Sequence, residues 1–597
     1  MALEQLSDVV QRCVTLPNDS YTTEDYDVFT IAGRTCIEEG NSAQVLSIVL
    51  DEKNQDIVRS MGWNLLPPLI QVLLKKEDKN LSHCLAVFNH LIKVCSSARQ
   101  PKELLIGLLE QLEQDDPEPI AESLHLLLNP LQKVLLCLGS RKASSLGMSL
   151  SSVLDQVAKL PLPHTKEQEE DDVFSLCRCC TDLTDFVRPF VHEARQNNLN
   201  SQNDNANKMA GDQDRGKEDE LRTELLKFCM KTLSHPLLEV QLKDPDTLAV
   251  SPLRNFATEI LNTLSAIGEP VPSLVFQPLL KRKQVPGFLE EEVRYPKESL
   301  ACLAHLVFVH HLAADTFPSV FSPVFSLRCN MEHIFECHFS FDVCVFTIIQ
   351  ELYEKSLVRV EDGSLPADLL EIKTFLQVPQ VNVLRHLLLC PQRTRGLKVF
   401  QLSVDKFDTE AKYNFFQYML KTSNHSGVEG YVIKNIKNQI DFALRPGNSN
   451  TWFEGVHLLP LLRKVLTLPD GPETDLLQYL DRVMESLNLL RYLIIRDKVT
   501  ENQTGIWTEL YKIEDAFIKP LRVGVNMSRA HYERELHNTM ETKRKESVLS
   551  VSVGDEKLPN MTSESQIQAL HSALHTFDMI ESVLVRIEEL TEVKETH

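Results

Sequence analysis

The stretch AESLHLLLNPLQKVLLCLG, residues 121 to 139, shows most directly how this chain folds. It is rich in leucine at helical spacing and lacks the short Val/Ile/Thr alternation that is typical of strands. The same texture returns in ELLIGLLEQLE (103 to 113) and LRNFATEILNTLSAIG (253 to 268). Such segments, about 12 to 25 residues long and closed by Pro or by Asn, Asp, Ser and Gly clusters, follow one another along the chain. The pattern predicts an all-α protein.

A chain of 597 residues is too long for one compact core, so it forms either several domains or an extended repeat array. Its hydrophobic fraction of 43% and charged fraction of 24% are ordinary for a folded protein. Stacked helix pairs with a period near 40 residues would produce this texture, although no crisp sequence repeat is visible. We therefore predict an irregular HEAT-like or armadillo-like helical repeat array, with an irregular helical bundle as the alternative.

Composition also suggests how the chain is divided. Residues 194 to 220 are dominated by Asn, Gln, Asp, Glu and Lys, which predicts a disordered linker. It would separate an N-terminal helical repeat region (1–193) from middle repeats (221–410) and a C-terminal helical region (411–597). A final amphipathic helix, roughly 565 to 592, should pack back on the array through apolar residues spaced by three and four. These are Ile567, Leu570, Leu574, Phe577, Ile580, Leu584, Ile587 and Leu590.

The net charge of the chain limits the classes of partner that it is expected to bind. A net charge of -22 argues against nucleic acid or an anionic membrane as the main ligand. Residues 411 to 550 carry +2, whereas residues 1 to 410 carry -18. The opening residues show no secretory signal, and apolar runs such as 299 to 314 are interrupted, so we expect no membrane span and a cytoplasmic location.

The sequence contains a motif that resembles a catalytic site, but the residues around it do not match those that such a site requires. Residues Gly211 to Lys217 read G-x-x-x-x-G-K, but Glu218 replaces the Ser or Thr of a phosphate-binding loop and no strand precedes it. Neither a G-x-S-x-G elbow nor a glycine-rich nucleotide fingerprint occurs. We therefore expect a non-catalytic protein without a cofactor.

Candidate metal ligands also have a simpler interpretation. His333, Glu336, Cys337 and His338 form H-x-x-E-C-H, but on a helix His338 would be turned about 100 degrees from Cys337. This spacing fits neither common zinc-protease pattern, so we interpret these residues as buried or half-buried side chains. The CRCC sequence at 177 to 180 has no second Cys/His pair at structural-zinc spacing, which predicts a mixture of core and surface thiols.

The most informative segment for binding is TSNHSGVEGYVIKNIKNQIDFALR, residues 422 to 445. On a helix its apolar side chains share one face, namely Val432, Ile433, Ile436, Ile440 and Ala443. The opposite sector carries polar side chains, namely Tyr431, Lys434, Asn438, Asp441 and Arg445. This polar face is either merely solvated or a binding face, and its Tyr, Asn, Lys and Arg residues favour contact with a partner.

Two further helices are predicted nearby. Thr474 is a candidate N-cap for a helix over 473 to 497, and the cations at its end are sufficiently explained by the helix dipole. Beyond NQTG, the apolar spacing from Ile506 to Leu521 predicts another helix, disturbed at Pro520.

These segments, together with further long ones along the whole chain, resemble the glomulin family. The further segments are MGWNLLPPLI (61 to 70), ELLKFCMKTL (224 to 233), NFATEILNTLSAIGEP (255 to 270), NQTGIWTEL (502 to 510), NMSRAHYE (526 to 533) and LHSALHTFDMIESVLVRIEEL (570 to 590). The resemblance implies a HEAT-like protein whose C-terminal part binds the RING domain of the RING-box subunit of cullin-RING ubiquitin ligases. Binding would mask the surface that recruits the ubiquitin-conjugating enzyme.

The resemblance also implies links to an FK506-binding immunophilin, to a hepatocyte growth factor receptor and to vascular smooth-muscle development. A helical scaffold or adaptor for such partners is therefore the alternative function, and the ligase partner would also bring the protein into the nucleus. The chain has Gly430 and Lys434 where alanine and glutamine are associated with the family, and a glycine inside a helix costs about 1 kcal/mol. We predict that the RING contacts are Tyr431, Lys434, Asn438, Asp441, Arg491, Tyr492, Arg496, Trp507, Lys519 and Arg522.

Overall fold

The computed structural model divides the chain into two compact units, Met1–Ser356 and Leu357–His597. It describes residues 1–16, 20–75, 80–96, 101–113, 117–204, 212–240, 251–281, 295–313, 322–337, 340, 342–388, 393–448, 452–499, 502–543, 552–553, 556–557 and 563–592.

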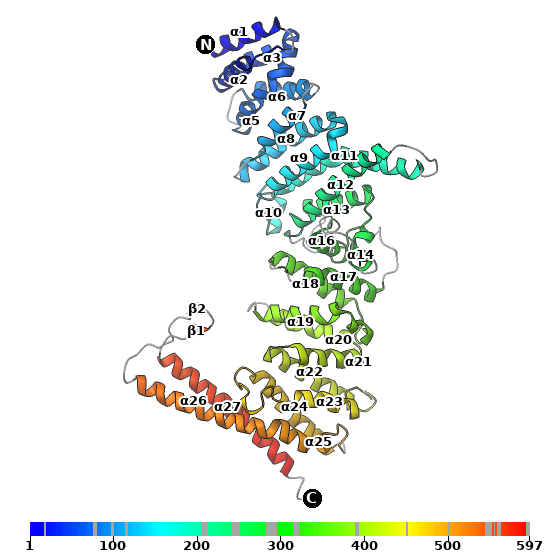
Figure 1. The fold of residues 1–597 in the computed structure, drawn as a ribbon, viewed down its shortest axis with the longest axis vertical. Helices are drawn as coiled ribbons and strands as arrows, with labels where there is room; N and C mark the ends of the chain where they lie inside the picture. The colour runs from blue at the N-terminus through cyan, green and yellow to red at the C-terminus, as the bar shows by residue number, and fades with distance from the viewer. Residues whose placement is uncertain are drawn as a thin grey trace. The chain divides into compact units, whose positions relative to one another are not determined.

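The first unit is a succession of helices that pack on their neighbours in the chain, such as α8 on α9 and α16 on α17 (Figure 1). Its α-helices are α1 (Ala2–Val14), α2 (Thr23–Glu38), α3 (Ser42–Leu50), α4 (Gln55–Met61), α5 (Leu66–Lys75), α6 (Leu81–Ser96), α7 (Pro101–Glu110), α8 (Pro117–Cys137), α9 (Lys142–Val157), α10 (Lys166–Glu170), α11 (Leu176–Asp204), α12 (Asp212–Ser234), α13 (Pro252–Ala266), α14 (Val271–Lys281), α16 (Lys297–Phe308), α17 (Pro323–Cys337) and α18 (Val343–Val358). Short 3₁₀ turns η1 (Glu52–Asn54), η2 (Gly62–Leu65) and η3 (Gly139–Arg141) join some of them.

The second unit is likewise a succession of packed helices. It contains η6 (Ala367–Glu371), α19 (Lys373–Leu388), α20 (Arg393–Lys406), α21 (Thr409–Thr422), α22 (Ser426–Ala443), α23 (Gly455–Val465), η8 (Gly471–Glu473), α24 (Leu480–Val499), α25 (Ile506–Ile513), the π-helical turn η9 (Glu514–Ile518), α26 (Lys519–Lys543) and α27 (Ser563–Glu592). Two strands of two residues each, β1 (Ser552–Val553) and β2 (Glu556–Lys557), pair antiparallel. The predicted all-α, HEAT-like repeat array is confirmed.

The expected division of the chain does not coincide with this arrangement. Helix α11 continues to Asp204 and α12 begins at Asp212, so much of the predicted linker 194–220 is helical, and residues 205–211 lie outside the described part. Extending an existing helix is cheap compared with nucleating one, so a polar stretch can continue a helix whose earlier turns are packed. The expected boundary at 410/411 falls inside α21, because the change in charge there does not interrupt helix packing.

The start of α24 differs from the sequence prediction, whereas the distortion predicted near Pro520 is found. Thr474 does not cap α24, which begins at Leu480; its hydroxyl instead donates to the carbonyl of Gly471 at 2.8 Å. The disturbance expected at Pro520 is present as the π-helical turn η9, which lies just before this proline. Proline has no N–H to donate and its ring clashes with the carbonyl four residues earlier, so a regular helix cannot continue unchanged here.

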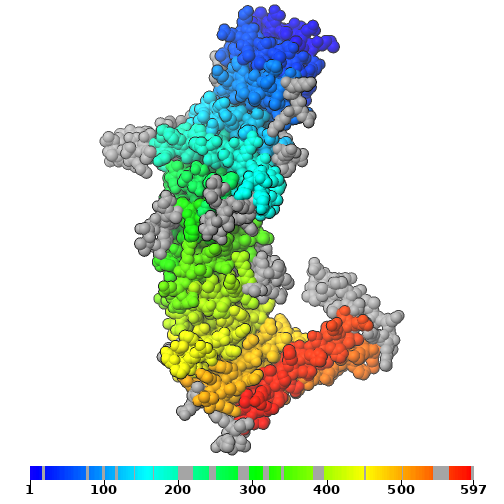
Figure 2. Space-filling view, turned by 180° about the vertical axis from the view of Figure 1, so that it is seen from behind, coloured from blue at the N-terminus to red at the C-terminus, as the bar shows by residue number. Residues whose placement is uncertain are grey.

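Helices α26 and α27 form an antiparallel pair that lies side by side in both views, orange and red (Figures 1 and 2). The final helix also packs on α24, as the sequence predicts. Its second half supplies the buried side chains Phe577, Ile580, Leu584 and Ile587, whereas Ile567 and Leu570 are half-buried. Among the described helices, none is both long and apolar enough to cross a membrane.

Candidate protein interface

Helix α22 packs as its pattern predicts. All five residues of the predicted apolar face, Val432 to Ala443, are buried. Gly430 is also buried, and a Cβ added to it would lie 2.9 Å from the backbone oxygen of Asp481. The helix nevertheless begins at Ser426, so the glycine does not unwind it. Its missing side chain lets α22 approach the start of α24 closely.

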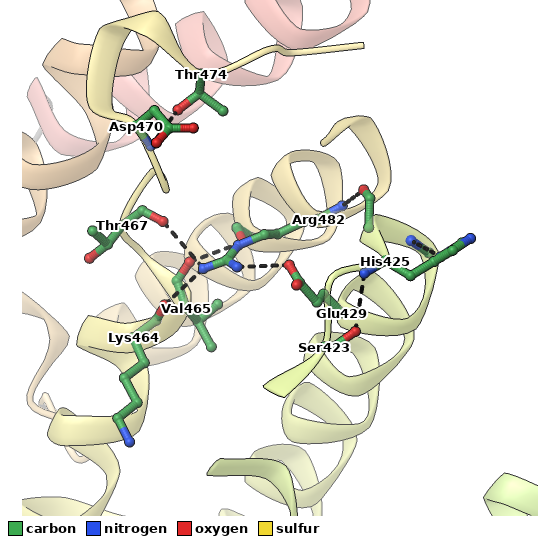
Figure 3. Close-up of polar contacts among 12 residues, drawn as sticks. Ser423, His425, Glu429, Lys464, Val465, Thr467, Asp470, Thr474 and Arg482 are labelled. Carbon is green, nitrogen blue, oxygen red and sulfur yellow. Dashed lines mark hydrogen bonds and ion pairs between the residues drawn. The ribbon is translucent and has the colours of Figure 1, made fainter. Parts of the chain in front are cut away.

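A buried ion pair holds these two helices together (Figure 3). Arg482 Nη1 of α24 donates to Glu429 Oε2 of α22 at 2.7 Å, and the side chains are only 13% and 3% exposed. Arg482 Nη2 also reaches the carbonyl oxygens of Lys464 and Thr467 at 3.3 and 3.5 Å, at the end of α23. Because its guanidinium contacts both α22 and the end of α23, Arg482 ties these two elements to its own helix α24.

Smaller contacts support this frame (Figure 3). The backbone N–H of Arg482 donates to the Ser426 hydroxyl at 3.2 Å, at the first residue of α22. His425 accepts from the N–H of Gly427 at 3.2 Å and thereby caps α22. In the turn before α24, the N–H of Asp470 donates to the Thr474 hydroxyl at 3.1 Å.

The outer side of α22 and α24 carries a hollow of about 330 Å³. We call it the α22–α24 hollow; it is lined by Lys434, Lys437, Glu485, Asn488, Arg491, Tyr492 and Ile495. Lys434 and Arg491 are exposed, and the apolar side chain of Ile495 is 45% exposed. Three cations, one acid and one accessible aliphatic side chain make a surface suited to a protein partner.

The cations of this hollow have no ion-pair partner in the part of the chain that the structure describes. Within the described ranges, Lys434, Lys437 and Arg491 form no ion pair closer than 4.0 Å. Glu485 is the one acidic residue that lines the hollow. The positive charge therefore remains available to a partner.

Asp441 and Tyr492, both predicted contacts, bind each other at the edge of the hollow. The Tyr492 hydroxyl donates to Asp441 Oδ1 at 2.8 Å, and Arg445 Nη2 donates to Asp441 Oδ2 at 2.7 Å. The hydrogen bonds from Arg445 and Tyr492 lower the pKa of Asp441. Burial, followed by the Asp441 carboxylate, raises the pKa of Tyr492 to about 12. Asp441 therefore serves mainly to join α22 to α24.

The structure separates the other predicted residues. Tyr431 points away from the hollow: its hydroxyl donates to Gln401 Oε1 at 2.8 Å and its ring lies edge-on to Phe400. Asn438 is exposed on α22 without lining the hollow, and Arg496 is half-buried on α24 near Asp441.

Sequence reasoning missed four lining residues, Lys437, Glu485, Asn488 and Ile495. Lys437 could have been found, because it lies one helical turn after Lys434. The three others required knowing how α24 is rotated against α22.

The remaining predicted contacts, Trp507, Lys519 and Arg522, line a second hollow of about 490 Å³. The C-terminal helix α27 contributes Glu588, Thr591 and Glu592 to it. Lys519 Nζ pairs with Asp515 at 2.8 Å, and Arg522 Nε donates to Glu588 Oε1 at 3.0 Å. Both cations are therefore paired within the chain: Lys519 with the preceding turn η9, and Arg522 with α27, which it joins to α26.

The chemical motifs of the sequence are structural where they are described. His333 is buried with Nε2 2.6 Å from the Val275 carbonyl oxygen, and burial lowers its pKa to about 4.

Cys177, Cys179 and Cys180 are all buried, so the expectation of surface thiols among them is wrong. Burial raises the pKa of Cys179 to about 12, which keeps it protonated. No group of His, Cys, Asp or Glu in the described ranges could hold a metal ion. His338 and Gly211 lie outside those ranges.

Comparison with known proteins gives consistent matches. A family model described as "Uncharacterised protein family, YAP/Alf4/glomulin" matches residues 1–573. Glomulin of Mus musculus is 45% identical over 605 aligned positions, covering 100% of this chain and 98% of the relative. Glomulin of Homo sapiens is 45% identical over 602 positions with the same coverage. Among solved structures, a circular tandem repeat protein aligns over 100% of this chain and 99% of its own at 11% identity, but its TM-score of 0.16 is too low to show a shared fold.

Proposed function

Since the chain belongs to the YAP/Alf4/glomulin family, we propose that it inhibits cullin-RING ubiquitin ligases by binding the RING domain of their RING-box subunit. The role requires no catalysis and no cofactor. Its place of action would be the cytoplasm, and the nucleus where the ligase is present. A contribution to vascular smooth-muscle development would follow from control of such ligases.

The observation that carries this proposal is the α22–α24 hollow, in the C-terminal region to which the family resemblance assigns RING binding. Three cations that form no ion pair with any described residue line this hollow together with an exposed isoleucine. The buried Arg482–Glu429 pair holds the same two helices together. A rigid, prepared surface loses little conformational freedom on binding, which favours affinity.

Steric occlusion would be sufficient for inhibition. A standard protein interface buries roughly 1,600 Å² in total, and a few anchor residues can carry most of its binding energy. A partner covered over that area cannot present the same surface to a ubiquitin-conjugating enzyme. Inhibition would therefore be competitive with the conjugating enzyme.

The test is calorimetry of the full chain with an isolated RING domain from a RING-box subunit, followed by a ubiquitin-transfer assay. We expect tight binding and a loss of transfer that excess conjugating enzyme restores. Tight binding without loss of transfer would reject inhibition, and absence of binding would reject the RING as partner.

A helical adaptor is the second candidate, and one observation in the first unit favours it. A hollow of about 500 Å³ runs between α11 and α13, and Val187, Val191, Arg188, Arg195 and Asn262 are among its lining residues. The adaptor function would be tested by capture of an immunophilin or receptor partner in the presence of saturating RING domain. Simultaneous binding would support an adaptor, whereas displacement by the RING would reject independent sites.

A further inference from the structure

Some cations of the second unit form ion pairs, and others form none with the described residues. Along α26, Arg522 binds Glu588, and Arg529 binds Asp578 at 2.8 Å and also Glu581. Lys519 is bound by Asp515. By contrast, Lys434, Lys437 and Arg491 converge on one hollow without an ion pair among the described residues.

These three cations differ from ordinary solvated ones because they line the same hollow. Like charges gathered in a concave site repel each other and focus the local field, so the site attracts an anionic group. Glu485 offsets one of the three charges, and the hollow keeps a positive balance in a chain whose net charge is -22. A basic site inside an acidic protein is a selective feature, because the rest of the chain repels acidic partners.

We propose that the α22–α24 hollow receives an acidic segment of the partner protein, with Arg491, Lys434 and Lys437 as its specificity-determining residues. This inference rests on the proposed function and adds the chemistry by which the partner is recognised. The planar guanidinium of Arg491 can bind a carboxylate through two parallel hydrogen bonds. Lys434 and Lys437 lie one turn apart on α22 and supply the opposite wall.

The lining favours a protein segment over a nucleic acid. Ile495 is 45% exposed in the same hollow and offers contact to an aliphatic side chain beside the carboxylate. A polyanion such as nucleic acid would have to lie along a surface whose overall charge is strongly negative. A short acidic segment with one apolar residue would match both the cations of the hollow and its exposed isoleucine.

The experiment compares two full-length triple variants that remove the same amount of charge. One is Lys434→Gln/Lys437→Gln/Arg491→Gln. The matched control is Lys373→Gln/Lys398→Gln/Lys421→Gln, which replaces exposed lysines on α19, α20 and α21 that do not line the hollow. Affinity for the RING domain is measured by calorimetry from low to high salt, and thermal unfolding confirms that both variants fold.

We expect the first variant to lose about 100-fold in affinity at low salt and to show little further salt dependence. The control should stay within about twofold of the unsubstituted chain. If the RING binds but both variants bind alike, the inference is overturned while the proposed function stands.

A second probe separates the inference from the identity of the partner. Anisotropy of a labelled peptide of Glu and Leu residues is measured with the same variants, and a single-stranded oligonucleotide serves as competitor. Binding that disappears only in the Lys434/Lys437/Arg491 variant supports the acidic-segment site even if the RING does not bind. No peptide binding, or equal displacement by the oligonucleotide, overturns it.

Discussion

Helices α22 and α24 and the final pair α26 and α27 use their charged residues in opposite ways. In the first pair, one ion pair is buried between the helices, and the three cations that line the α22–α24 hollow have no ion-pair partner among the described residues. In the second pair, the charges at the helix junction bind each other, as Arg522 with Glu588 and Arg529 with Asp578. The first pair of helices therefore leaves cations accessible for binding, whereas the second pair uses its charged residues in ion pairs between its own helices.

This difference bears on the predicted RING contacts, which remain predictions. Arg491 and Arg522 are both predicted RING contacts, and both are arginines on amphipathic helices. The structure leaves Arg491 exposed at a hollow and ties Arg522 to the C-terminal helix. A cation is a binding candidate only when its charge is not already satisfied inside the fold.

Breaking the buried pair should produce the largest effect. Arg482→Met leaves Glu429 as an unpaired buried charge, which costs about 3 to 5 kcal/mol of unfolding free energy. Urea unfolding monitored in the second unit measures the loss. The double variant Glu429→Leu/Arg482→Met should recover much of it, because it removes both charges. A single variant that costs less than about 1 kcal/mol would show that the pair is not the frame of the α22–α24 hollow.

Reversing a charge in the other pair should have a smaller effect. Arg522→Glu loses the ion pair and places two acids together, which costs roughly 1 to 2 kcal/mol because both side chains are about one-third exposed. Hydrogen exchange of α27 amides should accelerate. The charge-swapped double variant Arg522→Glu/Glu588→Arg should restore protection. Unchanged protection in the single variant would contradict a structural role for Arg522.

The close approach of α22 to α24 can be tested at Gly430. Alanine there improves helix propensity by about 1 kcal/mol, but its Cβ would meet the backbone oxygen of Asp481 at 2.9 Å. Backbone cannot move aside as a flexible side chain can, so overpacking should dominate and cost roughly 1 kcal/mol net. Urea unfolding of Gly430→Ala measures the sign. Net stabilisation by this variant would mean that the helices can separate without loss.

The last test concerns the Tyr492–Asp441 hydrogen bond, whose removal should have an effect of similar size that depends on pH. Because the folded pKa of Tyr492 is about 12 and the unfolded value is about 10, its stabilisation is complete below pH 10 and is lost as pH rises towards 12. Tyr492→Phe should cost about 1 kcal/mol at pH 8, and this difference should shrink between pH 10 and 12. Unfolding free energies of both proteins across this range provide the check. A difference that stays constant with pH would show that the pKa of Tyr492 is the same in the folded and the unfolded chain.

Much of the fold was predictable because it depends on local periodicity. The spacing of Val432, Ile436 and Ile440 defines a buried helix face whatever lies against it, and all three are buried. The final helix was found for the same reason. Helix ends were less predictable: Thr474 has the residue type of a cap, but the hydroxyl is used in a turn that precedes α24.

The candidate site was only partly predictable. Lys434, Arg491 and Tyr492 from the predicted set meet at one hollow, whereas Tyr431 packs on Phe400 and Arg522 binds Glu588. Each of these partners lies on a different helix, at a separation in sequence that no periodic pattern encodes.

The sequence by itself therefore determined that the chain is helical, which side chains each helix buries, and where a polar face remains. Only the tertiary structure decided which polar side chains neutralise one another and which are left for a partner. The physical reason is that helix formation and amphipathic burial depend on residues three and four apart, whereas ion pairing depends on the rotation and spacing of helices. Gly430 illustrates both: it is a weak helix residue in isolation, and the reason two helices can meet once folded.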